Sequence, residues 1–390
     1  MKRKALKKKR VSVKLTSSNH KNISEKRVLI MAGGTGGHIF PGLAVAKELQ
    51  KRECNVFWLG SFNGMEEDII SKTDIPLSLI SVVGLRGNGL LGWIKSPFLI
   101  VKSVISSILV LRKIKPQLVI GFGGFASGPG GLAAYILRIR LVIHEQNAIA
   151  GMTNRYLSKL ASKVLLGFPN AFGNRDDKKI RVVGNPVREE IKNITKKKKD
   201  LSENINILVL GGSRGARKLN KLLPEILDSV KEKNVRIVHQ SGKGNQTSTI
   251  EEYNKFSCDV EVIEFIESMD KYLSWADVVI CRSGASSVSE IAAVGLAAIL
   301  IPFPFAVDDH QFFNALWLSD NNAAKLIRDN TLDTIESKNI IKNLLKSENK
   351  MIDMGIQAKK MAYLNAVESI ADECEKSINS TFIKNNLKVA

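Results

Sequence analysis

Two apolar runs, each followed by a glycine-rich loop and a helical pattern, constrain the fold of this chain more than any other feature. Residues 28–31 lead into a loop over 32–37 and then into apolar residues at helical spacing. About 180 residues later, residues 207–210 lead into the loop 211–215 and a second helical pattern. A strand, a glycine turn and a helix in this order begin a doubly wound α/β unit. The recurrence therefore predicts two halves of similar construction.

Further strand candidates alternate with helical patterns, which predicts parallel sheets covered by helices. They span residues 56–59, 118–120, 141–143, 164–166, 236–239, 260–263, 278–281 and 298–301. A length of 390 residues also suits two domains better than one. We therefore expect an α/β protein with two Rossmann-like, doubly wound parallel-sheet domains that face each other across a cleft. The helical pattern from about residue 351 does not show by its spacing which domain it packs on.

Half of the net charge of +20 lies at the N-terminus. Residues 1–27 hold eleven lysines and arginines against a single acid, Glu25. With 44% hydrophobic and 25% charged residues, the whole chain has the composition of a folded globular protein, which excludes a wholly disordered or collagen-like chain. A nucleic-acid-binding protein is a competing interpretation that depends on this charge alone, because the rest of the chain shows no basic stripe interleaved with aromatic residues.

The cysteines and the long uncharged runs indicate neither a disulfide framework nor a membrane span. Four cysteines are scattered without CxxC spacing or histidine pairs, which fits a reducing cytoplasm and no zinc site. The runs 116–137 and 291–307 are interrupted by glycines or prolines. The basic arm lacks the apolar stretch of a secretory signal, and an organelle transit peptide is the alternative explanation for its few acids.

The first glycine loop and the histidine after it form the first candidate site. The loop 33–37 places backbone N–H groups at a helix N-terminus, where an anion such as phosphate is favoured. It matches neither GxGxxG with a later acidic residue nor a GK[ST] P-loop, and the alternative is a tight turn before a helix. His38 suits a general base, or else it bonds its own turn.

The second half offers a similar loop and a second strand-to-helix junction. The loop 211–215 adds the Ser213 hydroxyl to an anion site, or forms a turn with an N-cap serine. Residues 281–290 suit a diphosphate at a helix N-terminus, with Glu290 on ribose hydroxyls. The alternative is specific, because Ser287 and Glu290 have the spacing of a capping box.

Two polar clusters follow predicted strand ends, where ligands gather in α/β proteins. Residues 308–311, with His310 and Gln311, carry groups that can bind sugar hydroxyls, or form a capped polar loop. His144 and Glu145 suit a base and its orienting partner, or a loop hydrogen-bond network. The chain shows no DxD cluster, HExxH or GxSxG motif, so the sequence predicts no metal.

The segment 90–102 combines aromatic and aliphatic residues with lysines, as in an interfacial membrane contact. The residues that would make this contact are Leu90, Leu91, Trp93, Ile94, Lys95 and Phe98. The alternative is a buried helix with two lysines that extend to solvent.

Several motifs, taken in order, resemble one family. They are Gly33-Gly34-Thr35-Gly36-Gly37-His38-Ile39-Phe40-Pro41-Gly42, Gly121-Phe122-Gly123-Gly124-Phe125-Ala126-Ser127-Gly128-Pro129, His144-Glu145-Gln146-Asn147, Gly184-Asn185-Pro186-Val187-Arg188, His239-Gln240-Ser241-Gly242-Lys243-Gly244 and Arg282-Ser283-Gly284-Ala285. From about residue 26 to about 375 the chain resembles the MurG family of bacterial peptidoglycan N-acetylglucosaminyltransferases, in glycosyltransferase family 28. So many motifs in one order are far more specific than a single glycine loop.

The resemblance implies a GT-B fold and an inverting hexosyltransferase that needs no cofactor. It implies transfer of GlcNAc from UDP-GlcNAc to the C4 hydroxyl of MurNAc-pentapeptide on undecaprenyl diphosphate, which turns lipid I into lipid II in peptidoglycan synthesis. It places the protein peripherally on the cytoplasmic face of the bacterial inner membrane. Its expected partners are both substrates, an anionic membrane surface and other proteins of cell-wall synthesis and division, without nucleic acid.

The motifs also carry site residues over from the family. Donor contacts fall on Thr35, Gly36, Gly37, Asn147, Arg188, Ser213, Ile266, Ala285, Ser286, Ser287, Val288, Ser289, Glu290, His310 and Gln311. His38 is the candidate base and Glu145 the alternative, and Tyr135 is an aromatic neighbour of the membrane patch. Asn147, Arg188 and Ile266 come from the resemblance alone.

The expected domains follow from the resemblance and the charge pattern. They are a basic, disordered arm over 1–25, an acceptor and membrane domain over 26–188, a linker over 189–203, a UDP-GlcNAc-binding domain over 204–365, and a C-terminal helix and tail over 366–390. The arm departs from the family, whose members begin close to the first strand, and we expect it to add affinity for anionic lipid, at about 1 kcal/mol per basic residue near the surface. Competing enzyme interpretations are a GT-B transferase with another acceptor and a UDP-GlcNAc 2-epimerase.

Overall fold

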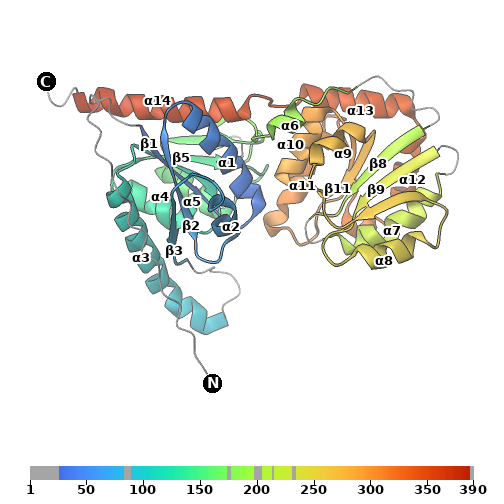
Figure 1. Ribbon diagram of the computed structural model, residues 1–390, viewed down its shortest axis with the longest axis horizontal. Helices are drawn as coiled ribbons and strands as arrows, with labels where there is room; N and C mark the ends of the chain where they lie inside the picture. Colours follow the sequence, from blue (N-terminus) through green and yellow to red (C-terminus); the bar gives the residue numbers. More distant parts are fainter. Residues whose placement is uncertain are drawn as a thin grey trace.

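The computed structural model describes residues 26–82, 89–173, 177–196, 204–212, 215–230 and 234–386, and it contains two parallel β-sheets, each covered by helices (Figure 1). The basic arm over 1–25 lies outside the described residues. The two-domain, doubly wound fold predicted from the recurring strand–loop–helix unit is confirmed.

The first sheet has the strand order β3-β2-β1-β4-β5-β6-β7, with all pairs parallel. Its strands are β1 (Arg27–Ala32), β2 (Asn55–Ser61), β3 (Leu77–Ile80), β4 (Leu118–Gly123), β5 (Arg140–Glu145), β6 (Lys163–Leu166) and β7 (Ile180–Val182). The helices between them are α1 (Gly36–Lys51), α2 (Met65–Ile70), α3 (Gly89–Ile114), α4 (Ser127–Ile136) and α5 (Met152–Leu160). Alternate residues of the buried strands fill apolar clusters on opposite faces of the sheet, as expected where helices cover both sides.

The second sheet has the order β10-β9-β8-β11-β12-β13, also parallel. Its strands are β8 (Asn204–Leu210), β9 (Asn234–Gln240), β10 (Asp259–Ile263), β11 (Val278–Cys281), β12 (Ala297–Leu300) and β13 (Lys325–Leu326). The remaining helices of the chain, in sequence order, are α6 (Glu189–Lys192), α7 (Arg217–Asp228), α8 (Gln246–Tyr253), α9 (Met269–Trp275), α10 (Ala285–Val294), α11 (His310–Ser319), α12 (Ile335–Leu345), α13 (Glu348–Lys360) and α14 (Ala366–Asn386). Short 3₁₀ turns lie at Val307–Asp309 and Asp329–Thr331. In each sheet the strand order reverses beside the first strand in the sequence, between β1 and β4 and between β8 and β11. Ligands bind at this switch point in such folds.

Every strand candidate named from the sequence is a strand, although β12 begins and ends one residue earlier than expected. The sequence missed β3, β7 and β13, which are edge strands of two to four residues. Such short, half-buried edges carry too few apolar residues to stand out from loops.

Helix α14 returns to the first domain, which settles the position that the sequence left open. In Figure 1 the two last helices run along one side of the molecule, α13 over the second domain and α14 over the first. Ile370, Cys374 and Ile378 are fully buried in the cluster formed by β1, β2 and β4. Glu373 accepts from Arg181 and Lys376, and Glu375 pairs with Lys26 at 3.0 Å. The C-terminal helix therefore completes the domain that the N-terminal strand begins.

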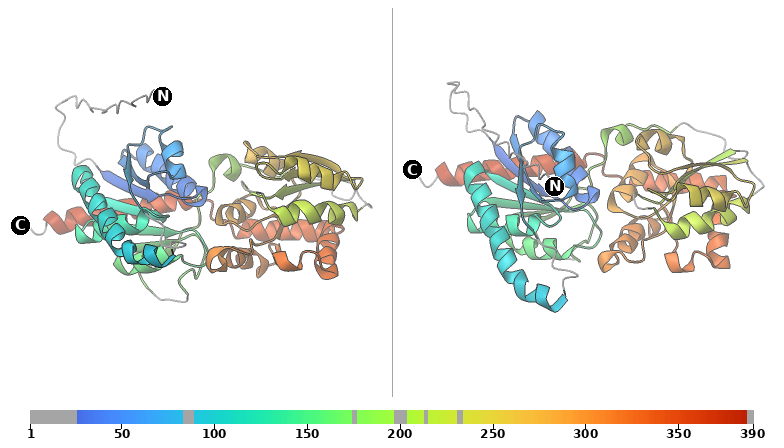
Figure 2. Two further views of the ribbon diagram at one scale, coloured as in Figure 1. Left: turned by 90° about the horizontal axis from the view of Figure 1, so that it is seen from below. Right: turned by 60° about the horizontal axis from the view of Figure 1, so that its bottom comes forward.

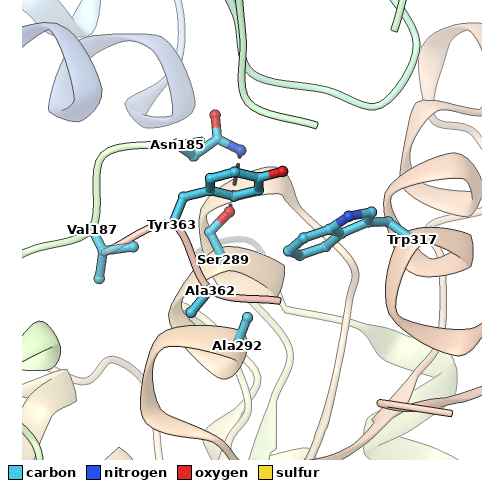
Figure 3. Close-up of a pocket in the computed structure, with 7 residues that line it drawn as sticks. All are labelled: Asn185, Val187, Ser289, Ala292, Trp317, Ala362 and Tyr363. Carbon is cyan, nitrogen blue, oxygen red and sulfur yellow. Dashed lines mark hydrogen bonds between the residues drawn. The ribbon is translucent and has the colours of Figure 1, made fainter. Parts of the chain in front are cut away.

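A buried polar contact and a partly exposed aromatic pair lie where the chain crosses between the two domains. The Asn185 amide donates to the Gln146 carbonyl at 3.0 Å and to the Ser289 hydroxyl at 3.1 Å (Figure 3). Tyr363 stacks on Trp317 with ring centroids 6.4 Å apart, and both side chains line the same small pocket. The expected linker starts with helix α6, whose Ile191 is buried in the second domain's core, while its residues 197–203 lie outside the described chain.

Candidate functional site

The first glycine loop leads into α1, and its N-terminal groups face outward. Thr35 is the N-cap residue and makes no side-chain capping bond. In the first turn only His38 and Ile39 bond back to the Thr35 carbonyl, at 3.1 and 3.2 Å. The N–H groups of Gly36 and Gly37 have no acceptor within the helix because the first turn of any helix lacks one. The strand, loop and helix predicted here are present, and the N-terminus has donors to offer a ligand.

His38 is oriented by its own loop. Its Nδ1 lies 3.2 Å from the Gly33 carbonyl oxygen and 3.4 Å from the Thr35 hydroxyl. Because a carbonyl only accepts, Nδ1 carries the proton and Nε2 has a free lone pair. The Nε2 edge lies over Gly123, where a Cβ would come within 3.0 Å. The ring therefore bonds its own turn, as one interpretation required, and also presents a basic nitrogen, as the other required.

Burial lowers the pKa of His38, while the nearby Glu145 and the bond to the Gly33 carbonyl oppose that shift. His310, from the second domain, lowers this pKa further across the domain junction, and Glu66 raises it. The net result is a neutral imidazole near pH 7. A neutral imidazole with a free nitrogen can accept a proton.

Glu145 and His144 serve a loop network, and the base-and-orienter pair is not formed. Glu145 is buried and accepts from the Asn147 backbone at 3.0 Å, from Gly151 at 3.1 Å and from the Asn154 amide at 2.8 Å. His144 points elsewhere, to the Gly184 carbonyl at 2.9 Å and the Gln146 amide at 3.0 Å. Burial lowers the pKa of His144 to about 4. A carboxylate with this many donors is better suited to holding a loop than to removing a proton.

Helix α10 does not use the capping box that its sequence suggests. Its N-cap is Gly284, without a side-chain capping bond, so Ser287 lies inside the first turn. Glu290 instead accepts from two nitrogens of Arg188, at 3.0 and 3.1 Å. Burial raises the pKa of Glu290, and Arg188 opposes that effect. The capping-box interpretation was therefore wrong, because the carboxylate reaches across to a residue 102 positions earlier.

The other donor-binding residues expected around α10 differ in how far their side chains are exposed to solvent. Ala285, Ser286 and Ser287 are half-buried at the start of the helix, where their backbone groups can meet a ligand. Val288 is fully buried. Ser289 faces the domain junction and bonds to Asn185 and to the Ala285 carbonyl. A ligand would therefore contact the first three side chains more readily than the last two.

His310 and Gln311 follow β12 on a tightly bent loop. Asp308 and Asp309 both have left-handed backbone angles, with φ of 54° and 51°. The His310 Nδ1 lies 2.8 Å from the Val307 carbonyl, and Gln311 accepts from the Phe303 N–H at 2.9 Å. Strained backbone of this kind concentrates at functional sites.

Asn314, which the sequence did not single out, joins this loop region to the first domain. It is fully buried and donates to the Asn147 side chain at 3.2 Å, while accepting from the Ala148 N–H at 2.7 Å. Asn147 of the first domain thus lies beside α11 of the second domain, the helix that begins with His310 and Gln311. Spacing along the chain gives no signal for such a bridge, because Asn314 lies in an ordinary helical pattern.

Two expected donor contacts are not assembled by the described side chains. Ser213 lies outside the described residues. Ile266 is buried in the core of the second domain, so only its backbone can meet a ligand. Among the described residues, no group of three or more His, Cys, Asp or Glu side chains could hold a metal ion.

Helices α3 and α4 display an apolar surface on the first domain. Its exposed residues are Phe98, Val101, Ile105, Leu109, Leu132, Tyr135 and Ile136. Phe98 is 74% exposed, so this part of the segment is not the buried helix that was the alternative. Figure 2 shows α3 projecting from the domain. The side chains of Leu90, Leu91, Trp93, Ile94 and Lys95 lie outside the described part of the structure.

Within the described chain, the helices are all too short or too polar to span a bilayer.

Two parallel-sheet α/β domains with candidate groups at their junction make up the GT-B fold, which many glycosyltransferases share. Models of the N-terminal and C-terminal domains of glycosyltransferase family 28 match residues 28–166 and 206–374. The chain belongs to this family, as its motifs indicated.

Relatives match over nearly the whole described chain. The UDP-N-acetylglucosamine–N-acetylmuramyl-(pentapeptide) pyrophosphoryl-undecaprenol N-acetylglucosamine transferase of Cellvibrio japonicus is 45% identical, over 89% of this chain and 97% of its own. The protein of the same name from Shewanella halifaxensis is 44% identical, over 90% and 96%. The crystal structure of Acinetobacter baumannii MurG has a TM-score of 0.79 at 39% identity and covers 90% of this chain and 99% of its own. A UDP-N-acetylglucosamine 2-epimerase shares the fold at 14% identity, with a TM-score of 0.62 over 89% and 95%.

Proposed function

We propose that this protein transfers N-acetylglucosamine from UDP-GlcNAc to the C4 hydroxyl of undecaprenyl-diphosphate-linked MurNAc-pentapeptide, forming lipid II from lipid I with inversion at the anomeric carbon. The observation that carries this proposal is the 45% identity, over 89% of the chain, to a relative with that transferase name. The epimerase-like structures support only a shared fold at 14% identity.

The base in this reaction is His38. Its free Nε2 takes the proton of the C4 hydroxyl as the oxygen attacks C1 of GlcNAc from the face opposite to UDP. The bond from C1 to the diphosphate oxygen breaks, and UDP leaves with the electron pair. Attack opposite to the leaving group inverts the anomeric centre. A well-placed base contributes about a hundredfold or more to such a step.

The leaving diphosphate is stabilised by the second domain together with Arg188. The N-terminus of α10 presents backbone donors at Ala285, Ser286 and Ser287, and helix N-termini favour negative charge. Arg188, which is 47% exposed, keeps a guanidinium face available beside Glu290. Ser213 adds a hydroxyl donor, the Ile266 backbone contacts the uracil, and Gln311 binds the sugar. Fixed donors and positive charge of this kind can do the electrostatic work of the reaction.

The protein binds the cytoplasmic face of the inner membrane through α3 and α4. The exposed residues Phe98, Val101, Ile105 and Leu109 recur at helical spacing, so they form one apolar face. Lys102, Arg112 and Lys113 are exposed on the same helix and suit anionic lipid headgroups. This position would bring the first domain to an acceptor whose lipid tail stays in the bilayer. Vesicle binding that is unchanged after deletion of residues 2–24 would remove the basic arm from this proposal.

The test is transfer of labelled GlcNAc from UDP-GlcNAc to a lipid I analogue by the wild type and by His38→Ala. Product from the wild type, with a loss of about a hundredfold or more in the variant, supports both the reaction and the base. Product with little loss would keep the reaction and move the base elsewhere. Folded wild-type protein that forms no product but releases an epimer of UDP-GlcNAc would overturn the transferase in favour of an epimerase.

A further inference from the structure

Glu66 is a fully buried carboxylate beneath the first glycine loop, and no role in the reaction described above accounts for it. It lies on α2 with no solvent exposure. Its Oε1 accepts from the Ser61 N–H at 2.8 Å and the Ser61 hydroxyl at 2.7 Å, and its Oε2 accepts from the Gly34 N–H at 3.0 Å. Among the described residues no lysine or arginine pairs with it. A buried charge without an ion-pair partner is costly to keep and is therefore a candidate for function.

The surrounding chain is shaped to hold this carboxylate. A Cβ at Gly33 or Gly64 would overlap the carboxylate oxygens, and one at Gly60 would lie 2.6 Å from Cγ. Burial acts to raise the pKa of Glu66, but the hydrogen bonds from Ser61 and Gly34 hold it below the usual range. The side chain is thus ionised near pH 7 in a space that only glycines leave open.

One peptide group connects Glu66 to His38. The Gly34 N–H that Glu66 accepts belongs to the same planar peptide as the Gly33 carbonyl, which accepts from His38 Nδ1 at 3.2 Å. A negative charge at the N–H end polarises the peptide and makes its carbonyl a stronger acceptor. A stronger acceptor fixes the Nδ1–H tautomer and stabilises the imidazolium that forms when Nε2 takes a proton.

We propose that Glu66 is a positioning residue that sets the orientation, tautomer and basicity of His38 through the peptide between Gly33 and Gly34. The proposal depends on the proposed role of His38 as the base. The arrangement resembles a carboxylate that orients a catalytic imidazole, with a peptide group inserted between them.

Other charged or titratable groups also face His38, and the test must separate their effects. Glu145 on β5 raises the pKa of His38 through its charge, and His310 on α11 lowers it. Neither is bonded to the Gly33–Gly34 peptide in the described structure. A change at Glu66 should therefore act on Nδ1 without altering these two groups.

The experiment compares Glu66→Gln, Glu66→Asp and the control Glu67→Gln. Glu67 is the next residue of α2 and is partly exposed, and it accepts from the Asn63 N–H at 3.2 Å, away from His38. The His38 pKa is measured by NMR titration of the imidazole, assigned by its loss in His38→Ala. We expect Glu66→Gln to lower that pKa by about half a unit or more, because the negative charge is removed. Glu66→Asp keeps the charge and should lower the pKa by less. Glu67→Gln should leave the pKa unchanged.

Kinetics give the second measurement. The acidic limb of kcat/KM should move to lower pH in Glu66→Gln because a weaker base stays unprotonated at lower pH. The plateau of kcat should fall about tenfold, with little change in KM for UDP-GlcNAc. In the His38→Ala background Glu66→Gln should cause no further loss, because its effect passes through the missing ring.

An unchanged His38 pKa with an unmoved acidic limb would overturn the proposal, as would an equal loss in both backgrounds. If Glu66→Gln does not fold, Glu66→Asp still tests the proposal, because its displaced carboxylate should lower the His38 pKa and move the acidic limb in the same direction by a smaller amount. A fully active His38→Ala variant would instead refute the proposed base, while the NMR titration would still report whether Glu66 controls the imidazole.

Discussion

Two strand–loop–helix units, β1 with α1 and β11 with α10, have the same backbone arrangement, but different charged side chains lie beside them. Neither α1 nor α10 has a side-chain cap, so each leaves N-terminal donors for a ligand. The first loop has a buried carboxylate beneath it and a histidine above it, whereas α10 has Arg188 alongside. Negative charge beside a base favours proton uptake, and positive charge beside a helix N-terminus favours a departing anion. In the reaction proposed above, a few side chains would thus adapt one backbone unit to opposite halves of the chemistry.

The sharpest test of this division is Arg188→Ala. Removal of a fixed group that stabilises developing charge lowers kcat by about a hundredfold to a thousandfold. The acidic limb of the pH profile should stay close to its place because the main groups that shift the pKa of His38 do not include Arg188. Steady-state kinetics across pH check both points, and Arg188→Lys should recover part of the loss. A change in KM alone would assign Arg188 to ground-state binding.

Each domain also buries one neutral histidine, and both should make folding sensitive to acid. Burial lowers the pKa of His144 to about 4 and that of His239 to about 3, against about 6.5 in the unfolded chain. The unfolded state therefore binds more protons below pH 6.5, and stability falls as the pH drops toward the folded values. For His144 the loss approaches roughly 3 kcal/mol by pH 4.

Urea unfolding at pH 7 and pH 5 measures this loss. His144→Gln should flatten the pH dependence of the first domain, and His239→Gln that of the second. If the free energy of unfolding changed equally with pH in the wild type and in both variants, the acid sensitivity would not come from these two histidines.

Alanine substitutions at two glycines with left-handed backbone, one in each domain, distinguish the cost of a steric clash from the cost of backbone strain. Gly124 has φ of 82°, and a Cβ there would overlap the Gly33 carbonyl that His38 uses. Gly212 has the same φ, but nothing lies within 4 Å of the position that a Cβ would take, so alanine there adds backbone strain of about 1–2 kcal/mol only. We expect Gly124→Ala to destabilise by roughly 1–3 kcal/mol more than Gly212→Ala. Urea-unfolding midpoints test this, and equal shifts would show that the loop around Gly33 yields easily.

The smallest expected effect concerns the outer surfaces of the domains. Phe98→Ala on α3 should weaken binding to anionic vesicles by about tenfold, because a buried phenyl ring contributes a few kcal/mol at most. Ile335, on α12 of the second domain, is 78% exposed and serves as the matched control. Flotation with vesicles compares the two variants. An equal loss in both would mean that apolar exposure alone, and not the α3 surface, determines binding.

The sequence located the buried strands and the loop before α1 well, because long apolar runs and glycines act locally. It was less informative where a side chain could satisfy either a local or a distant partner. Ser287 and Glu290 have capping-box spacing, yet Glu290 bonds to Arg188. Likewise, His144 precedes Glu145 in the chain but points to Gly184. A local pattern states which bonds are possible, and only the packed chain decides which are made.

Residue order alone was enough to establish that two strand–glycine–helix units recur, that His38 lies in the first turn of the first helix and that the motifs match family 28. Strand periodicity, helix starts and motif order depend on neighbours along the chain, so they can be read from it. Packing in three dimensions was needed to establish that α14 completes the first domain, that Asn314 bridges to Asn147, and that Glu66 lies one peptide away from His38. The long-range contacts among these join residues from 32 to more than 300 positions apart, and only the packing of sheets and helices brings such residues within hydrogen-bond distance.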